Sequence, residues 1–85
     1  MNSHKPFVVK YVLPSGKVVG YHLNTGCQIG EKGQAKIYTS DPKAVLNNIH
    51  NSFTWVWENS EEKYRTQPAW EGASLGEIQI VPEEI

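Results

Sequence analysis

Apolar residues dominate two runs near the start of the chain, residues 7–13 and 18–23, and Pro14-Ser15-Gly16 separates them. β-Branched and aromatic residues favour strands, and a short Pro/Gly segment between two such runs is typical of a hairpin. Proline suits the first central position of a type I turn, and Gly16 can take the left-handed position that follows. We therefore predict a β-hairpin in which Leu13 faces Lys17.

Counting back from this turn predicts which side chains of the hairpin share a face, because side chains alternate along a strand. The predicted pairs are Phe7 with Leu23, Val9 with Tyr21 and Tyr11 with Val19. This register gathers the large side chains on a core face. Lys10 and His22 then lie on the opposite, mixed face, which is either wet or covered by a partner.

The next segment is broken by Asn24-Thr25-Gly26 and by residues 30–33, which are rich in glycine. Residues 27–29 between these breaks are predicted to be irregular or a short strand. Residues 35–40 alternate between the two sides of a strand, so we predict a third strand that extends the hairpin into a meander.

A helix is predicted from Asp41-Pro42, since the Asp side chain can accept orphan N–H groups and proline fits the first helical position. Its apolar stripe consists of Val45, Leu46, Ile49 and Phe53. Asn51-Ser52 lowers helix propensity, so the helix is predicted to end there. Residues 53–57 have a period of two and are predicted to form a fourth strand.

Residues 59–74 are polar and interrupted by Pro68 and Gly72, which predicts a long connection with Tyr64 and Trp70 as anchors. Residues 77–82 are predicted to be a closing strand at a sheet edge, because proline is tolerated there. The expected fold is α+β, an antiparallel sheet of about five strands in the order βββαββ with one helix packed on one face. The whole chain, residues 1–85, is expected to form one domain.

Composition narrows the classes of function. The 85 residues are 39% hydrophobic and carry a net charge of −1, so they have no field that would attract nucleic acid in general. A chain this short has a thin stability margin, which favours a homo-oligomer. The lone Cys27 favours a reducing, cytoplasmic compartment. No signal peptide or membrane span is predicted.

Catalytic and metal sites find little support in the sequence. One cysteine and three scattered histidines have no metal-ligand spacing, so we expect no metal and no cofactor. A Cys27 and His22 nucleophile pair is conceivable, but no third, orienting group accompanies it. We therefore expect a protein that is not an enzyme, and keep a small Cys/His enzyme as the last alternative.

Two arrangements of aromatic and basic residues are candidates for binding. Tyr64, Arg65 and Trp70 could form a lid that stacks on a nucleotide-like ligand. Lys10, His22 and Lys36 would then supply charge or hydrogen bonds. The favoured alternative uses Trp55 and Trp57, which are expected to point to opposite sides, one into the core and one toward a partner or the loop.

Several short motifs lie in the first part of the chain: Lys10-Tyr11, Gly20-Tyr21-His22, Thr25, Cys27 and Ala35-Lys36-Ile37-Tyr38. Through them the chain resembles, over roughly its first two-thirds, a group of short, uncharacterised bacteriophage proteins with an N-terminal hairpin followed by a helix. The resemblance implies a phage accessory protein, made in the cytoplasm of an infected host cell, that blocks a host defence protein or sequesters a nucleotide signal.

The resulting hypothesis is a non-enzymatic, homo-oligomeric binding protein, an anti-defence inhibitor that captures a small nucleotide-like ligand or blocks a host protein. The alternative is a protein interaction module that docks through its sheet edge or its tryptophan surface.

Overall fold

The predicted hairpin is present in the computed structural model, which describes residues 5–23 and 29–85. Strand β1 (Phe7–Val12) pairs antiparallel with β2 (Val18–His22). The Gly16 N–H donates to the Leu13 carbonyl at 2.8 Å, and the Leu13 N–H donates to the Lys17 carbonyl at 2.9 Å. Gly16 has a φ of 91°, the left-handed conformation that glycine adopts without steric cost. The predicted pairing of Leu13 with Lys17 is confirmed.

The predicted register beyond the turn is wrong by one residue on β2. Val12 lies opposite Val18, but Tyr11 lies opposite Gly20 and Lys10 opposite Tyr21, because Val19 is an extra residue in a β-bulge. A shift of one residue moves every side chain on the strand to the other face. Gly20 and His22 therefore face the core, while Tyr21 faces the opposite side of the sheet.

Glycine at position 20 is required by the neighbouring strand. A Cβ on Gly20 would collide with the side-chain methyl Cγ2 of Ile29. Ile29 belongs to β3 (Ile29–Gly30), a two-residue strand that pairs antiparallel with β2. The absent side chain thus makes room on the core face for the side chain of the outer strand.

The predicted third strand over residues 35–40 is wrong. The 3₁₀ helix η1 (Lys32–Gln34) precedes this segment. Within residues 35–40, one residue, Tyr38, pairs with a strand, through an isolated antiparallel bridge to Phe7. The Phe7 N–H donates to the Tyr38 carbonyl at 3.0 Å, and the Tyr38 N–H donates to the Phe7 carbonyl at 2.8 Å. Ile37 remains 58% exposed, so alternation in the sequence did not correspond to a buried face. The predicted segment 27–29 lies mostly outside the described residues.

The closing strand is confirmed as an edge strand, but it lies two residues further along the chain than the predicted residues 77–82. It is β4 (Gln79–Glu84), which pairs antiparallel with β1 and forms one edge of the sheet β3-β2-β1-β4. The Ile85 N–H donates to the Pro6 carbonyl at 3.2 Å, so residue 85 points toward β1. Backbone groups alternate between the two edges of a strand, which places Pro82 outward. Pro82 therefore lies where no partner strand needs its missing N–H.

The predicted helix starts where expected but continues much further. Helix α1 (Pro42–Asn59) has 18 residues, and the Asp41 side chain accepts from the Lys43 N–H at 3.1 Å. The predicted end at Asn51-Ser52 and the predicted strand over residues 53–57 are wrong. The reason is a spacing of four residues that continues past the Asn-Ser pair. The buried side chains of α1 are Val45, Ile49, Phe53 and Trp57.

The connection from α1 to β4 is folded into short helices. They are α2 (Glu62–Arg65) and the 3₁₀ helices η2 (Pro68–Trp70) and η3 (Leu75–Glu77). Trp70 is 1% exposed and closes the end of the core. The predicted long connection thus contains short helices, and its two predicted anchors, Tyr64 and Trp70, pack in or against the core.

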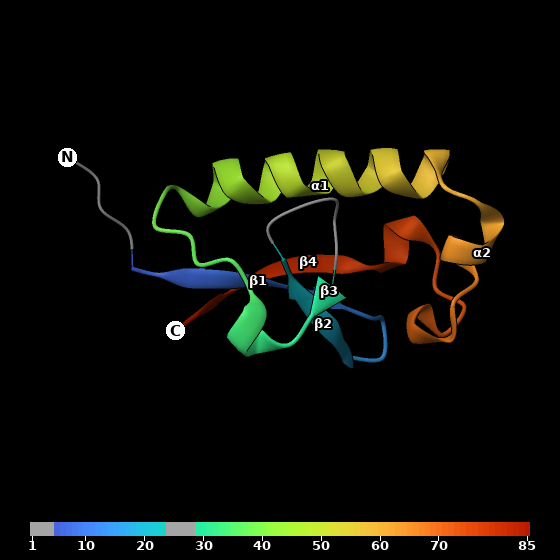
Figure 1. The fold of residues 1–85 in the computed structure, drawn as a ribbon, viewed down its shortest axis with the longest axis horizontal. Coiled ribbons are helices and arrows are strands. Elements are labelled where there is room, and N and C mark those ends of the chain that lie inside the picture. The colour runs from blue at the N-terminus through green and yellow to red at the C-terminus, as the bar shows by residue number, and fades with distance from the viewer. Residues whose placement is uncertain (1–4, 24–28) are drawn as a thin grey trace.

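Helix α1 runs along one face of the sheet, and the core lies between them (Figure 1). The predicted α+β class, with one main helix on an antiparallel sheet, is confirmed, although the sheet formed by the described residues has four strands instead of five. The opposite sheet face, which we call the open face, carries η1 near β2, and no other helix among residues 5–23 and 29–85 covers it (Figure 1). Within the described ranges, no helix has the length and apolar character needed to cross a membrane.

Candidate functional site

Three of the residues predicted to bind a ligand or a partner meet at the C-terminal end of α1, but they form part of the core. The ring centroids of Trp57 and Tyr64 are 6.1 Å apart, those of Trp57 and Trp70 are 5.6 Å apart, and those of Tyr64 and Trp70 are 6.0 Å apart. The Trp70 indole N–H donates to the Tyr64 carbonyl at 3.1 Å. The rings pack on one another, so they do not present faces to a ligand.

Arg65, predicted as part of the same lid, closes the end of α1 instead. Its Nη1 donates to the carbonyls of Trp57, at 3.0 Å, and Ser60, at 2.9 Å. The last carbonyls of a helix have no partner within the helix, and a cationic side chain there also suits the helix dipole. The structure thus gives Arg65 a capping role that the sequence pattern did not indicate.

His22 lies in the core and not on the mixed face predicted for it, because of the bulge at Val19. It is 6% exposed, and its Nδ1 lies 3.1 Å from the hydroxyl oxygen of Tyr11. Burial, followed by the positive charge of Lys36, lowers the pKa of His22 below its usual value. The imidazole is therefore neutral at pH 7 and serves to satisfy a buried tyrosine. Its proposed partner Cys27 lies outside the described residues.

The backbone of Lys36 lies beside that of His22, but the Lys36 residue is exposed. The Lys36 N–H donates to the His22 carbonyl at 3.3 Å, and its Nζ lies 5.3 Å from the centroid of the Tyr38 ring. A cation over an aromatic face at this distance is mildly attractive. His22 and Lys36, two of the three residues predicted to supply charge or hydrogen bonds to a ligand, are thus close in space, but only Lys36 is exposed.

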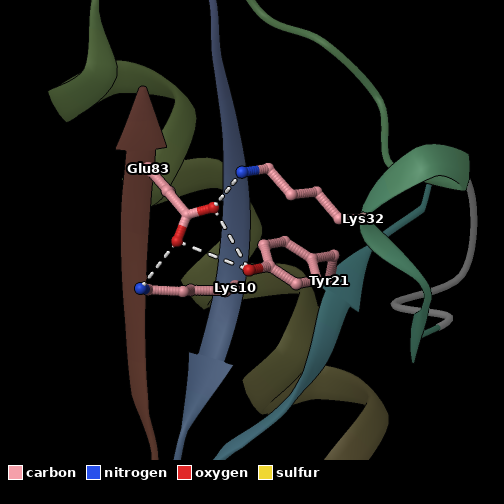
Figure 2. A network of polar contacts seen from close by, with 4 residues as sticks. All are labelled: Lys10, Tyr21, Lys32 and Glu83. Atoms are coloured by element: carbon pink, nitrogen blue, oxygen red, sulfur yellow. Dashed lines mark hydrogen bonds and ion pairs between the residues drawn. The ribbon is translucent and has the colours of Figure 1, made fainter. Parts of the chain in front are cut away.

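A polar network that the sequence did not predict crosses the open face of the sheet, on the side away from α1 (Figure 2). Figure 2 shows the Glu83 carboxylate of β4 between Lys10 of β1, Tyr21 of β2 and Lys32 of η1. The Nζ atoms of Lys10 and Lys32 lie 3.0 and 2.8 Å from its oxygens, and the Tyr21 hydroxyl donates at 3.1 Å. Of these four residues, the sequence analysis identified only Lys10. Glu83 is 73 positions away from Lys10 in the sequence, so no local pattern connects the two.

The electrostatics of the network are those of a stabilised carboxylate. Hydrogen bonds from Lys32, then from Lys10, lower the pKa of Glu83 to about 2. The carboxylate is therefore ionised at neutral pH and holds no proton to give in acid catalysis. Two ammonium groups against one carboxylate leave an excess of one positive charge. In the described part of the chain, no three His, Cys, Asp or Glu side chains are grouped as metal ligands.

The solvent side of α1 has an unusual composition. We call Ala44, Asn47, Asn48, Asn51, Trp55 and Glu58 the outer face of α1; all six are exposed and lie opposite the buried stripe. Trp55 is 66% exposed, whereas Trp57 is 9% exposed. The two tryptophans therefore point to opposite sides, as expected, but they do so on a helix and not on the predicted strand. Lys43 and Glu58, near the two ends, are the charged residues of the helix.

Two surface hollows are small. One, of about 200 Å³, is lined by Leu13, Trp70 and Glu71 among others, and one of about 220 Å³ is lined by Phe7, Pro42 and Pro82 among others. Both volumes lie below the roughly 300–1,000 Å³ of typical small-molecule sites. Of the residues predicted to bind a ligand, Trp70 lines the first hollow and none lines the second.

Comparison of the chain with protein-family models, with curated proteins and with solved structures finds no match. Proposals about function therefore depend on the geometry of the chain itself.

Proposed function

We propose that this chain is a non-enzymatic protein interaction module that contacts its partner through the outer face of α1, with Trp55 as the central anchor. The observation that carries the proposal is a tryptophan that is 66% exposed on a helix face whose middle contains no charged residue.

The composition of this face is that of an interface core. Such cores are depleted in charged residues and enriched in tryptophan, and truncating a tryptophan there often costs much of the binding energy. Solvated helix faces normally carry charged residues instead. The three asparagines of the outer face add amide groups that both donate and accept hydrogen bonds. Trp55 thus has the uncharged amide of Asn51 one turn before it, toward the middle of the face, and the carboxylate of Glu58 one turn after it, at the end of the face.

The other hypotheses gain less from the structure. Trp70 is buried, which leaves the predicted ligand-stacking lid of Tyr64, Arg65 and Trp70 without its largest ring. Docking at the sheet edge would use β4, but the outward Pro82 interrupts the row of donors that an added strand needs. The tryptophan surface is therefore the favoured form of the interaction hypothesis.

The resemblance to bacteriophage accessory proteins supports a narrower proposal, in which the module is made in an infected cell and inhibits a host protein as a homo-oligomer. In this proposal the outer face of α1 contacts either that host protein or a second copy of the chain.

Site-specific photo-crosslinking tests the proposal. A photoreactive amino acid replaces Trp55 in one variant and the exposed Lys36, which lies outside α1, in a matched control. After irradiation in the expressing cell, we expect a discrete protein adduct from position 55 that is absent from position 36. If position 55 yields no more adduct than position 36, the outer face of α1 is not a docking surface.

A second candidate function is the capture of an anionic ligand on the open sheet face. Lys10, Lys32 and Tyr21 already converge on one carboxylate, so their donors have the geometry to hold an anion. Calorimetry with a nucleoside triphosphate should then give tighter binding to Glu83→Gln than to the wild type, and weaker binding to Lys32→Met. Equal heats for the three proteins would exclude this function.

A further inference from the structure

We infer that the partner of the outer face of α1 is a second copy of this chain, with the two helices antiparallel about a two-fold axis near Asn51. The inference deepens the proposed function and rests on it, because it concerns the same surface.

The spacing of the outer face suits a two-fold axis. Ala44 and Glu58 are each seven residues from Asn51, and Asn47 and Trp55 are each four residues from it. In an antiparallel pair centred on Asn51, Ala44 meets Glu58 of the second copy, and Asn47 meets Trp55 of the second copy. The indole N–H of each tryptophan then points toward an amide that can accept it. Around the axis, Asn51 meets its own copy, and an amide is complementary to itself.

The charges of α1 also fit an antiparallel pair. Lys43 is at the N-terminal end and Glu58 is in the last turn. Antiparallel packing brings Lys43 of each copy beside Glu58 of the other, at both ends of the interface. Parallel packing would instead bring like charges together. The uncharged middle is what a two-fold axis requires, since a charge there would face its own copy.

The isolated helix gains nothing from these two charges. The helix dipole disfavours a cation near the N-terminus and an anion near the C-terminus, and α1 has no acidic residue in its first turn and no basic residue in its last. In an antiparallel pair, Lys43 lies near the C-terminal end of the partner helix and Glu58 near its N-terminal end. Each charge is then at the helix end that its sign favours.

The small size of the contact favours weak association. A helix of 18 residues is about 27 Å long. One helix pair of this length buries less than the roughly 1,600 Å² of a standard protein interface. We therefore expect a dimer that dissociates at micromolar rather than nanomolar concentration.

Sedimentation equilibrium of the purified full chain tests the inference. We expect the wild type to dimerise, and Lys43→Glu or Glu58→Lys to weaken the dimer about tenfold, because each puts like charges together at both ends. The double reversal, and an equimolar mixture of the two single variants, should regain the wild-type affinity. Trp55→Ala should weaken the dimer by a factor of about 30 or more.

Thermal unfolding of the dilute monomers controls for folding. Both reversals match the helix dipole, so their monomers should unfold at the wild-type temperature or above it. Loss of dimer without loss of monomer stability then isolates the interface. A helix pair in the parallel orientation would respond to neither single reversal, and that result would overturn the antiparallel arrangement.

A monomeric wild type at millimolar concentration would overturn the second-copy inference. If the photo-crosslink at position 55 then identifies a different protein, the proposed function stands with another partner. If position 55 gives no adduct at all, the proposed function fails as well, so the two failures are distinguishable.

Discussion

Replacing Trp57 with alanine tests both the extent of α1 and the position of the core. The Trp57 ring centroid lies 5.7 Å from that of Phe53, 6.1 Å from that of Tyr64 and 5.6 Å from that of Trp70. Removing the indole leaves a cavity that these three rings line. We expect a large loss of stability.

The magnitude follows from the burial. Truncation of a buried tryptophan to alanine costs about 3–5 kcal/mol. A domain of this length has a total free energy of unfolding of about 4–13 kcal/mol. One kcal/mol shifts the melting temperature by about 4–8 °C at this size, so Trp57→Ala should lower it by about 15 °C or more. The variant is expected to be largely unfolded in mild urea.

Trp55→Ala is the matched control, since it removes the same indole two residues away on the solvent side of the same helix. Its effect on the dilute monomer should stay within about 0.5 kcal/mol. Urea titration followed by far-UV circular dichroism measures both variants. If Trp55→Ala destabilises the dilute monomer as much as Trp57→Ala does, the helical placement of the two rings is refuted.

Three further predictions concern other parts of the chain. Gly20→Ala should lower the free energy of unfolding in urea by about 1–3 kcal/mol, because the added methyl overlaps Ile29. Gly33→Ala is the control and should lower it far less, because its methyl meets no atom within 4 Å. Arg65→Ala should cost about 1–2 kcal/mol and speed amide exchange in the connection after α1; unchanged exchange would contradict the capping role. Glu83 has a pKa of about 2 in place of 4.5, so its contribution to stability is complete above pH 4.5 and is lost as the pH falls toward 2. The melting temperature of Glu83→Gln should therefore depend less on pH over that range than the wild-type melting temperature does. The same pH dependence in both proteins would refute the contribution of the network.

Local chemistry explains which elements the sequence predicted well. The turn at Pro14 to Gly16 depends on the conformations of those residues alone, and the start of α1 depends on Asp41 and Pro42. Both features were predicted correctly, because the residues that determine them are adjacent in the chain. Pro82 likewise indicated an edge strand by its missing N–H.

The bulge at Val19 shows why a register cannot be counted from a turn alone. The extra residue is compatible with the sequence because Gly20 leaves space that Ile29 fills from another strand. That requirement is tertiary, and no pattern within residues 7–23 contains it. The placement of His22 depended on this register, so it was wrong for the same reason.

The length of α1 was missed because two criteria disagreed. Asn51-Ser52 disfavours a helix by propensity, while Val45, Ile49, Phe53 and Trp57 continue a four-residue spacing. Packing of an apolar stripe outweighs propensities of a few tenths of a kcal/mol per residue. The alternation of Trp55 and Trp57 was compatible with both a strand and a helix, so it did not decide between them.

The candidate surfaces differ in how far the sequence could reveal them. The network around Glu83 required the pairing of β4 with β1, which brings together residues from opposite ends of the chain. The outer face of α1, in contrast, is visible in the sequence once the helix is known to reach Asn59. An extended helix turns a run of asparagines and one tryptophan into a continuous surface.

Stability and association are coupled in a chain of this size. Any partner that binds the folded chain but not the unfolded one raises stability by mass action, by about 2.7 kcal/mol when the partner is present at 100 times its dissociation constant. That gain is a sizeable fraction of the total for 85 residues. With the outer face of α1 as the contact between two copies, the melting temperature must rise with protein concentration. Trp55→Ala weakens the dimer by a factor of about 30 or more and leaves the core intact. Its melting temperature should therefore equal that of the dilute wild type, and should begin to rise only at about 30 times the protein concentration that the wild type needs.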